Sequence, residues 1–214
     1  MKVGTDGVLL GAWGNVDGSR ILDIGTGTGL IALMAAQRNS EATVLGIDID
    51  PEAVKQANEN IAASPFSERV RCEMQDVMTL HPTERFDAIL CNPPFFTEDT
   101  LPKDKGRALA RNNKSMPFPQ LIPKVTSLLS DDGSFSIIVP STLTQEIVGL
   151  CLAENLLLQR RCQVRTTEHK PPRRALMTFS RKQGTTCSEQ ELCLMADNGS
   201  RSQAYQELTD KFYL

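Results

Sequence analysis

The sequence predicts an α/β fold in which helices cover both faces of one mostly parallel sheet. Short apolar runs alternate with segments of helical periodicity, and this alternation implies parallel strands joined by right-handed crossovers. Acidic residues or prolines follow several of these runs, as expected at the carboxyl edge of such a sheet. The chain has 214 residues, 40% of them hydrophobic, so it is long enough to bury one core as a single domain, 1–214.

The expected elements follow one another regularly along the first two thirds of the chain. Strands are predicted at 20–24, 43–48, 70–74, 86–91 and 133–139, and helices at 29–38, 51–63 and 118–129. Asp50 is a suitable N-cap, and Pro51 suits the first turn of the helix that follows it. The run Asp131-Asp132-Gly133 predicts a turn into the fifth strand.

Beyond Pro140 the pattern predicts the completion of a seven-stranded sheet with an antiparallel strand at its edge. A helix is expected at 141–154, strands at 156–165 and 174–181, a further candidate strand at 189–196 and a helix at 201–210. Residues 97–117 form a long stretch without periodicity. Such a stretch beside a strand end predicts a substrate loop.

Composition excludes several classes of protein. No apolar stretch approaches 18 residues and no signal-peptide pattern begins the chain, so we expect a cytoplasmic protein that does not enter a membrane. The six cysteines contain no C-x-x-C pair and only two histidines accompany them, so we expect no metal site. Cys91 is expected to face the core, with a catalytic thiol as the alternative.

The tetrapeptide Asn92-Pro93-Pro94-Phe95 is the most informative motif, and it directly follows the apolar run 86–91. Two prolines remove two backbone donors and fix φ, so the strand must end there at a rigid corner. An amide that donates and accepts, proline-flanked carbonyls and an aromatic face suit a planar group that carries an amine. The alternative is a proline-terminated strand with a core phenylalanine.

A second motif runs from Ile21 to Leu30, where a short strand leads through alternating glycines into a helix. Glycines 25, 27 and 29 allow positive φ and let a ligand approach bare backbone at a helix N-terminus. A dinucleotide site usually has the spacing G-x-G-x-x-G instead. Asp23, Asp48 and Asp76 end three successive strands, and three carboxylates would repel a pyrophosphate. They favour a ligand with an ammonium and a sulfonium, S-adenosylmethionine, over NAD.

Together these motifs resemble class I S-adenosylmethionine-dependent methyltransferases of the Asn-Pro-Pro-aromatic group, which methylate adenine amines or glutamine amides of release factors. Four runs narrow the resemblance to the bacterial tRNA-Val adenine-37 N6-methyltransferases: Met1 to Trp13, Asp23 to Leu33, Asn92 to Phe96 and Leu208 to Leu214. The resemblance covers essentially the whole chain. It implies a Rossmann-like class I methyltransferase fold and methylation of an adenine N6 in a tRNA anticodon loop.

The resemblance also implies roles for individual residues. Asn92 and the Pro93 carbonyl would accept the two amine hydrogens, while Pro94 holds the corner and Phe95 stacks on the base. Asp48 would hold the ribose of the cofactor, Asp76 its adenine amine, and Ile49 and Val77 its adenine ring. The other cofactor residues implied are Thr5, Asp6, Asp23, Gly25, Thr26, Gly27 and Gly29. Helix capping alone would explain Thr5 and Asp6 equally well.

Positive charge is concentrated in two segments although the net charge is −3. Residues 160–182 contain eight Lys or Arg and one acid, and residues 103–114 contain five and one. Clustered basic residues beside a stacking aromatic predict an RNA-backbone site. The predicted contacts are Arg107, Arg111, Lys170, Arg173 and Arg174, and 141–214 is expected to form both the sheet edge and an RNA-contact segment. Solvated surface charge is the alternative.

Other functions remain open at this point. A glutamine methyltransferase would use the same pocket, whereas a DNA adenine methyltransferase would need a sizeable target-recognition domain, for which the sequence gives no sign. An NAD-dependent dehydrogenase or a non-catalytic RNA-binding module would leave Asn-Pro-Pro-Phe unexplained. We expect a monomeric enzyme with tRNA as its partner.

Overall fold

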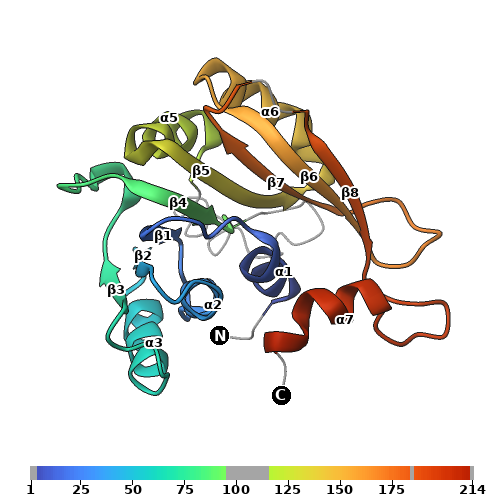
Figure 1. The fold of residues 1–214 in the computed structure, drawn as a ribbon, viewed down its shortest axis with the longest axis horizontal. Helices are drawn as coiled ribbons and strands as arrows, with labels where there is room; N and C mark the ends of the chain where they lie inside the picture. Colours follow the sequence, from blue (N-terminus) through green and yellow to red (C-terminus); the bar gives the residue numbers. More distant parts are fainter. Residues whose placement is uncertain (1–3, 95–115, 184–185, 213–214) are drawn as a thin grey trace, which may run out of the picture.

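The computed structural model describes residues 4–94, 116–183 and 186–212, and within them it contains one eight-stranded sheet in the order β3-β2-β1-β4-β5-β7-β6-β8 (Figure 1). The strands are β1 Arg20–Ile24, β2 Thr43–Asp48, β3 Val70–Met74, β4 Phe86–Cys91, β5 Leu129–Pro140, β6 Leu157–Arg165, β7 Arg174–Ser180 and β8 Ser188–Cys193. The five strands β3, β2, β1, β4 and β5 are parallel, as the alternation with helices predicted.

The C-terminal part of the sheet differs from the prediction in two respects. Residues 188–193 add an eighth strand, which pairs in parallel with β6. The antiparallel strand is β7, which lies between β5 and β6 rather than at the edge. Residues 175–180 are all buried, which is typical of a central strand whose two faces are covered.

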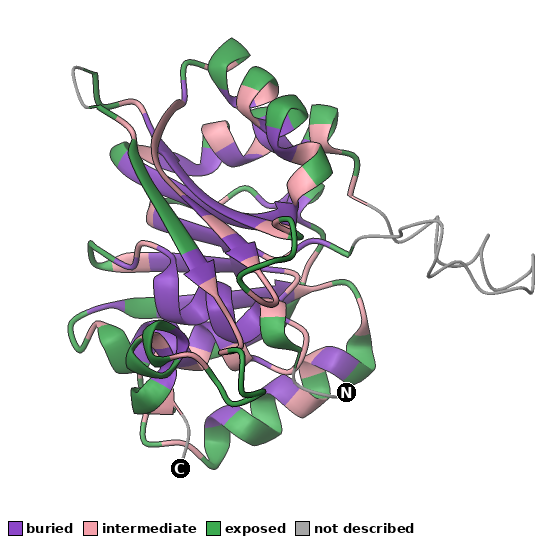
Figure 2. Ribbon diagram, turned by 90° about the vertical axis from the view of Figure 1, so that its right-hand side faces the viewer, coloured by how far each residue is buried: buried purple, intermediate pink, exposed green. Residues whose placement is uncertain are grey.

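Helices cover both faces of the sheet, as predicted. They are α1 Thr5–Trp13, α2 Leu30–Arg38, α3 Pro51–Ala62, α5 Phe118–Leu128, α6 Thr144–Ala153 and α7 Gln203–Thr209, with short 3-10 turns η1 Val77–Thr79, η3 Ser141–Leu143 and η4 Asp210–Phe212. Figure 2 shows the buried strands in purple between helices whose outer surfaces are green.

Successive residues along a strand pack into two separate cores, because their side chains point to opposite faces of the sheet. Ile21 belongs to the core under α1, α2 and α3, and Leu22 to the core under α5 and α6. Both residues are 0% exposed. The sheet is therefore held rigidly from both sides, and its carboxyl edge is a fixed platform.

The start of α3 agrees with the sequence prediction, whereas the predicted turn at 131–133 is absent from the described structure. The Asp50 side chain accepts a hydrogen bond from the Glu52 amide at 3.0 Å and caps α3, with Pro51 in the first turn, as predicted. The turn residues 131–133 instead lie within β5, where the pairing with β4 shifts register. A Cβ on Gly133 would lie 2.9 Å from the Phe86 carbonyl oxygen, so a side chain has no room there.

In the part of the chain that the structure describes, no helix is long and apolar enough to span a bilayer.

Candidate active site

Most of the predicted cofactor residues line one cavity at the carboxyl ends of β1, β2 and β4. Its volume is about 870 Å³, which is within the range of pockets for small molecules. Its walls include Thr5, Asp6, Gly25, Thr26, Gly27, Asp48, Ile49, Asp76, Val77, Asn92, Pro93 and Pro94. Because parallel strands end at the same edge of a sheet, residues far apart in the sequence meet here.

The glycine turn between β1 and α2 forms the floor of the cavity. Gly25, Gly27 and Gly29 have φ values of 70°, 57° and 81°, in the region that favours glycine. The amides of Gly25 and Thr26 both donate to the Ile47 carbonyl, at 2.9 and 3.0 Å, and this ties the turn to β2. Gly29 is not one of the cavity residues, since it begins α2 and packs against Ala57 of α3.

Asp48 stands at the end of β2 with both carboxylate oxygens already engaged. One oxygen accepts from the Gly27 amide at 2.9 Å, and the other accepts from the Asp50 amide at 2.9 Å. A carboxylate offers about four lone-pair positions, so each oxygen of Asp48 retains one for a ligand. This arrangement suits two neighbouring hydroxyl groups such as those of a ribose.

The part of the cavity beside η1 combines one carboxylate with apolar surface. Asp76 caps η1 by accepting from the Met78 amide at 2.9 Å. Ile49 is 48% exposed and Val77 is buried, and both residues line the cavity. A large exposed isoleucine beside a buried valine and a carboxylate is suited to a planar ring that carries an amine.

Asp23 lies behind the glycine turn and does not line the cavity, although the sequence analysis grouped it with Asp48 and Asp76. It is 0% exposed, and one of its oxygens accepts from the Thr26 hydroxyl at 2.6 Å. Burial raises the pKa of its carboxyl from 3.8 to about 7, and the hydrogen bond from Thr26 opposes this shift. Asp23 therefore acts directly on the shape of the glycine turn, and on a ligand in the cavity only through that turn.

The predicted acceptor corner lies on the wall of the same cavity. Asn92, Pro93 and Pro94 follow β4, and all three line the cavity. Asn92 is half-buried, and a Cβ on Gly7 of α1 would lie 4.0 Å from its amide nitrogen. Phe95, the predicted stacking residue, lies outside the described residues.

Cys91 faces the core as expected. It is 0% exposed and packs in the cluster under α5 and α6. Burial raises the pKa of its thiol far above the usual range, so the thiol stays protonated. This excludes Cys91 as a nucleophile.

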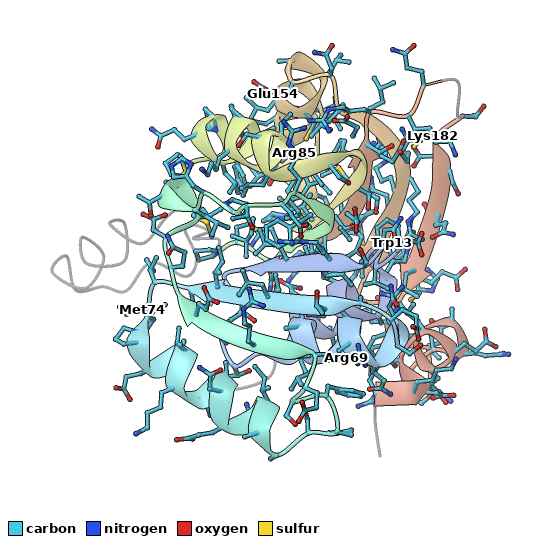
Figure 3. All side chains as sticks on the ribbon, turned by 60° about the vertical axis from the view of Figure 1, so that its left-hand side comes forward. Trp13, Arg69, Met74, Arg85, Glu154 and Lys182 are labelled. Carbon is cyan, nitrogen blue, oxygen red and sulfur yellow. The ribbon has the colours of Figure 1, made fainter. Side chains whose placement is uncertain are left out.

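The basic segment 160–182 consists largely of side chains with internal partners. Arg160 lies 3.9 Å from the centre of the ring of Trp13, the last residue of α1. Trp13 is labelled in Figure 3. Arg161 and Arg165 form ion pairs with acids of β8 at 2.8 and 2.9 Å, and Arg181 donates to the Ser130 and Thr126 carbonyls.

Of the predicted RNA contacts, Arg174 forms an ion pair with Asp6 at 2.8 Å. This arginine is therefore next to the cavity, because Asp6 lines it. Lys170 and Arg173 are exposed, and their side chains have no partner among the described residues. Arg107 and Arg111, with most of the predicted loop 97–117, lie outside the part that the structure describes.

The cavity residues that were not predicted from the sequence include Gly7, Gln75 and Met116. Gln75 donates to the Asp76 carbonyl and the Thr79 hydroxyl, and so braces η1. The Met116 methyl would lie 3.6 Å from a Cβ on Gly25. Met116 directly precedes the Pro117-Phe118 start of α5, and a helix start after a strand end is a signal for the same edge.

Comparison with known proteins identifies relatives of the whole chain. Residues 4–155 match the family Methyltransferase small domain. A protein of Bacteroides thetaiotaomicron named tRNA1(Val) (adenine(37)-N6)-methyltransferase is 40% identical over 217 residues, which cover 100% of this chain and 91% of the relative. A protein of the same name from Tolumonas auensis is also 40% identical, with 100% and 90% coverage.

Solved structures show the same fold. A predicted O-methyltransferase from Agrobacterium tumefaciens has a TM-score of 0.73 at 19% identity and covers 96% of both chains. A ribosomal protein L11 methylase from Lactobacillus delbrueckii subsp. bulgaricus has a TM-score of 0.58 at 20% identity, with coverage of 83% of this chain and 77% of the other.

Proposed function

Since the chain belongs to the methyltransferase small domain family and to the tRNA1(Val) (adenine(37)-N6)-methyltransferases, we propose that it methylates N6 of adenine 37 in a valine tRNA. The observation that carries the proposal is the position of Asn92, Pro93 and Pro94 on the wall of the cavity that Asp48 and Asp76 also line. A donor pocket and an amine-binding corner thus share one space.

The methyl donor is S-adenosylmethionine, and the described residues fit it. The sulfonium of this cofactor supplies an activated methyl group. Asp48 retains acceptor positions for two ribose hydroxyls, and Asp76 lies beside Ile49 and Val77 where an adenine ring with its amine is expected. Among the described residues, four aspartates line the cavity, Asp6, Asp48, Asp50 and Asp76, and their negative charge disfavours a pyrophosphate.

At the acceptor site, the main contribution of the protein is to align the adenine amine with the methyl donor. The exocyclic amine of adenine is a poor nucleophile because its lone pair is delocalised into the ring. The Asn92 side-chain oxygen and the Pro93 carbonyl accept hydrogen bonds from its two N–H groups, which favours a tetrahedral nitrogen whose lone pair is localised and aimed at the donor. The nitrogen becomes cationic when it gains the methyl group, and it then readily loses one proton to solvent. Catalysis therefore comes from proximity and orientation, without a strong general base.

The RNA is held outside the cavity. An adenine must leave its stack to reach Asn92, and this costs little in a single-stranded loop. Lys170 and Arg173 lie in the connection between β6 and β7, and Arg174 at its end pairs with Pro140 at the end of β5. The connection is therefore at the same edge of the sheet as Asn92, within reach of an RNA backbone. We infer a cytoplasmic monomer that needs no metal.

The test is incubation with labelled S-adenosylmethionine and tRNA that lacks the modification, followed by mass spectrometry of the nucleosides. N6-methyladenosine at position 37 of the valine tRNA is the expected product, and Asp48→Ala should bind the cofactor much more weakly. Labelling of a release-factor glutamine without labelling of tRNA would replace the proposal with the glutamine methyltransferase alternative.

A further inference from the structure

The first turn of α1 is part of the cavity wall but is weakly held by its own helix. Gly4, Thr5, Asp6 and Gly7 all line the cavity. Gly4 is the N-cap and provides no side-chain hydrogen bond, and the first backbone bond, from Val8 to Gly4, is long at 3.3 Å. An uncapped first turn tends to fray, because its amides have no intrahelical acceptors.

One side chain ties this turn to the sheet. Asp6 accepts a hydrogen bond from the Arg174 side chain at 2.8 Å. Within the described part of the chain, this is the one side-chain hydrogen bond made by residues 4–7. Both side chains are about two-thirds buried, with exposed fractions of 26% for Asp6 and 32% for Arg174. An ion pair that is partly shielded from water is worth more than one on the open surface.

Arg174 is itself anchored in the sheet. Its backbone pairs with Pro140 of β5 and Val164 of β6, and its guanidinium also donates to the Arg173 carbonyl at 3.1 Å. The same carbonyl accepts from the Ser141 amide at 3.1 Å. The guanidinium therefore extends from a fixed point of the sheet to the uncapped end of a helix.

From this geometry we propose that Arg174 is a positioning residue for the cofactor site. By holding Asp6, it keeps the first turn of α1 at the cavity wall and Gly7 close to Asn92, whose amide nitrogen would lie 4.0 Å from a Cβ on Gly7. Arg174 thereby acts on both halves of the reaction, the donor pocket and the acceptor corner, without contacting either substrate. The inference depends on the proposed function only in taking S-adenosylmethionine as the ligand of the cavity.

The test compares Arg174→Gln with Arg161→Gln, a matched control. Arg161 pairs with Glu189 at the same distance of 2.8 Å, and neither of these residues lines the cavity. Calorimetry with S-adenosylhomocysteine, without RNA, is expected to show affinity weaker by on the order of tenfold for Arg174→Gln and unchanged for Arg161→Gln. Arg174→Lys should recover part of the affinity.

A double-mutant cycle then separates the pair from its parts. Asp6→Asn should weaken binding as Arg174→Gln does, and the double variant should be little worse than either single variant. Thermal unfolding of every variant verifies that each is folded. If Arg174→Gln does not fold, Arg174→Lys takes its place in the comparison.

Three results would overturn the inference. Equal affinities of Arg174→Gln and Arg161→Gln would show that the pair is only structural. In a second result, Arg174→Gln would leave the affinity for S-adenosylhomocysteine unchanged but reduce the slope of log K for RNA binding against log salt concentration by about one. Arg174 would then be an RNA contact. Failure of the wild type to bind S-adenosylhomocysteine would overturn both this inference and the proposed function, so the two kinds of failure are distinguishable.

Discussion

Asp23 lies one residue before the end of β1 and Asp48 ends the neighbouring strand β2, yet their surroundings give them opposite properties. Asp23 is fully buried with a raised pKa, whereas Asp48 is partly exposed and accepts two backbone hydrogen bonds. The sequence predicts where both carboxylates stand, because each follows an apolar run. It does not predict which one faces the ligand, since that depends on how the glycine turn folds over Asp23.

The stability of the protein should depend on pH through Asp23. Its carboxyl has a pKa of about 7 in the folded protein and an ordinary value of 3.8 when unfolded, because burial penalises the charged form. Between these values the folded state holds a proton that the unfolded chain has released. The free energy of unfolding therefore falls as pH rises from about 4 to about 7, by an amount on the order of a few kcal/mol.

Urea denaturation of wild type and Asp23→Asn across this range measures the effect. The stability of the wild type relative to Asp23→Asn should fall steadily as pH rises and level off above pH 7, since asparagine does not titrate. Asp132→Asn, at an exposed carboxylate, is the control and should follow the wild type. A difference that does not vary with pH would show that Asp23 is ionised in the folded protein.

Asn92 should affect turnover and leave cofactor binding intact. Asn92→Ala removes the side-chain oxygen that aligns the amine, so we expect kcat to fall on the order of 10²-fold or more. The affinity for S-adenosylhomocysteine should stay nearly constant. Single-turnover kinetics and calorimetry give the two values, and equal reductions in both would mean that Asn92 only supports the wall of the cavity.

At the level of elements, the connection between β6 and β7 is where the basic segment reaches solvent. The sequence shows eight basic residues in 160–182 but cannot show which of them form internal contacts. Arg161 and Arg165 face acids of β8 only because β8 lies beside β6, and the sequence pattern does not determine that pairing. The charge of the sequence therefore overstates the charge available to RNA.

We predict that Lys170→Ala with Arg173→Ala weakens tRNA binding and makes its salt dependence shallower by about one for each phosphate that the protein no longer neutralises. Cofactor affinity should not change, because neither residue lines the cavity. The matched control is Lys55→Ala with Lys182→Ala, two exposed lysines, the second at the other end of β7 (Figure 3). Identical salt titrations for both double variants would show that the connection is ordinary solvated surface.

For the whole molecule, the alternation of apolar runs is sufficient to predict five parallel strands and helices on both faces. The position of β7 in the sheet cannot be predicted in this way. Its short, largely apolar sequence is equally suited to an edge strand and to a strand with neighbours on both sides. Its place between β5 and β6 results from two long antiparallel pairings that form only in the folded chain. The candidate site shows the same contrast. Its residues at strand ends were predictable from the sequence, whereas the contributions of Gly7 in α1 and of the start of α5 were not.

Cofactor binding should stabilise the entire fold, since the cavity is built from segments that lie far apart in the sequence. A ligand at about 100 times its Kd adds about 2.7 kcal/mol to the free energy of unfolding. For a domain of this size, that corresponds to a rise of roughly 5 to 10 °C in Tm. Differential scanning fluorimetry should show this rise with S-adenosylhomocysteine and none with NAD, and the reverse result would contradict the assignment of the cavity.

Helix α1 is held in part by residues that lie much later in the sequence than the helix itself. Seven of its residues are buried, and its partners include Arg160, Arg174 and, through Trp13, Gln190 of β8. These three partners are separated from α1 by 147 to 177 positions in the sequence, so their contacts with the helix can form only after most of the chain has left the ribosome. The ion pair between Asp6 and Arg174 is therefore a late contact of the fold, and the first turn of α1 is tied to the sheet only when β7 has left the exit tunnel.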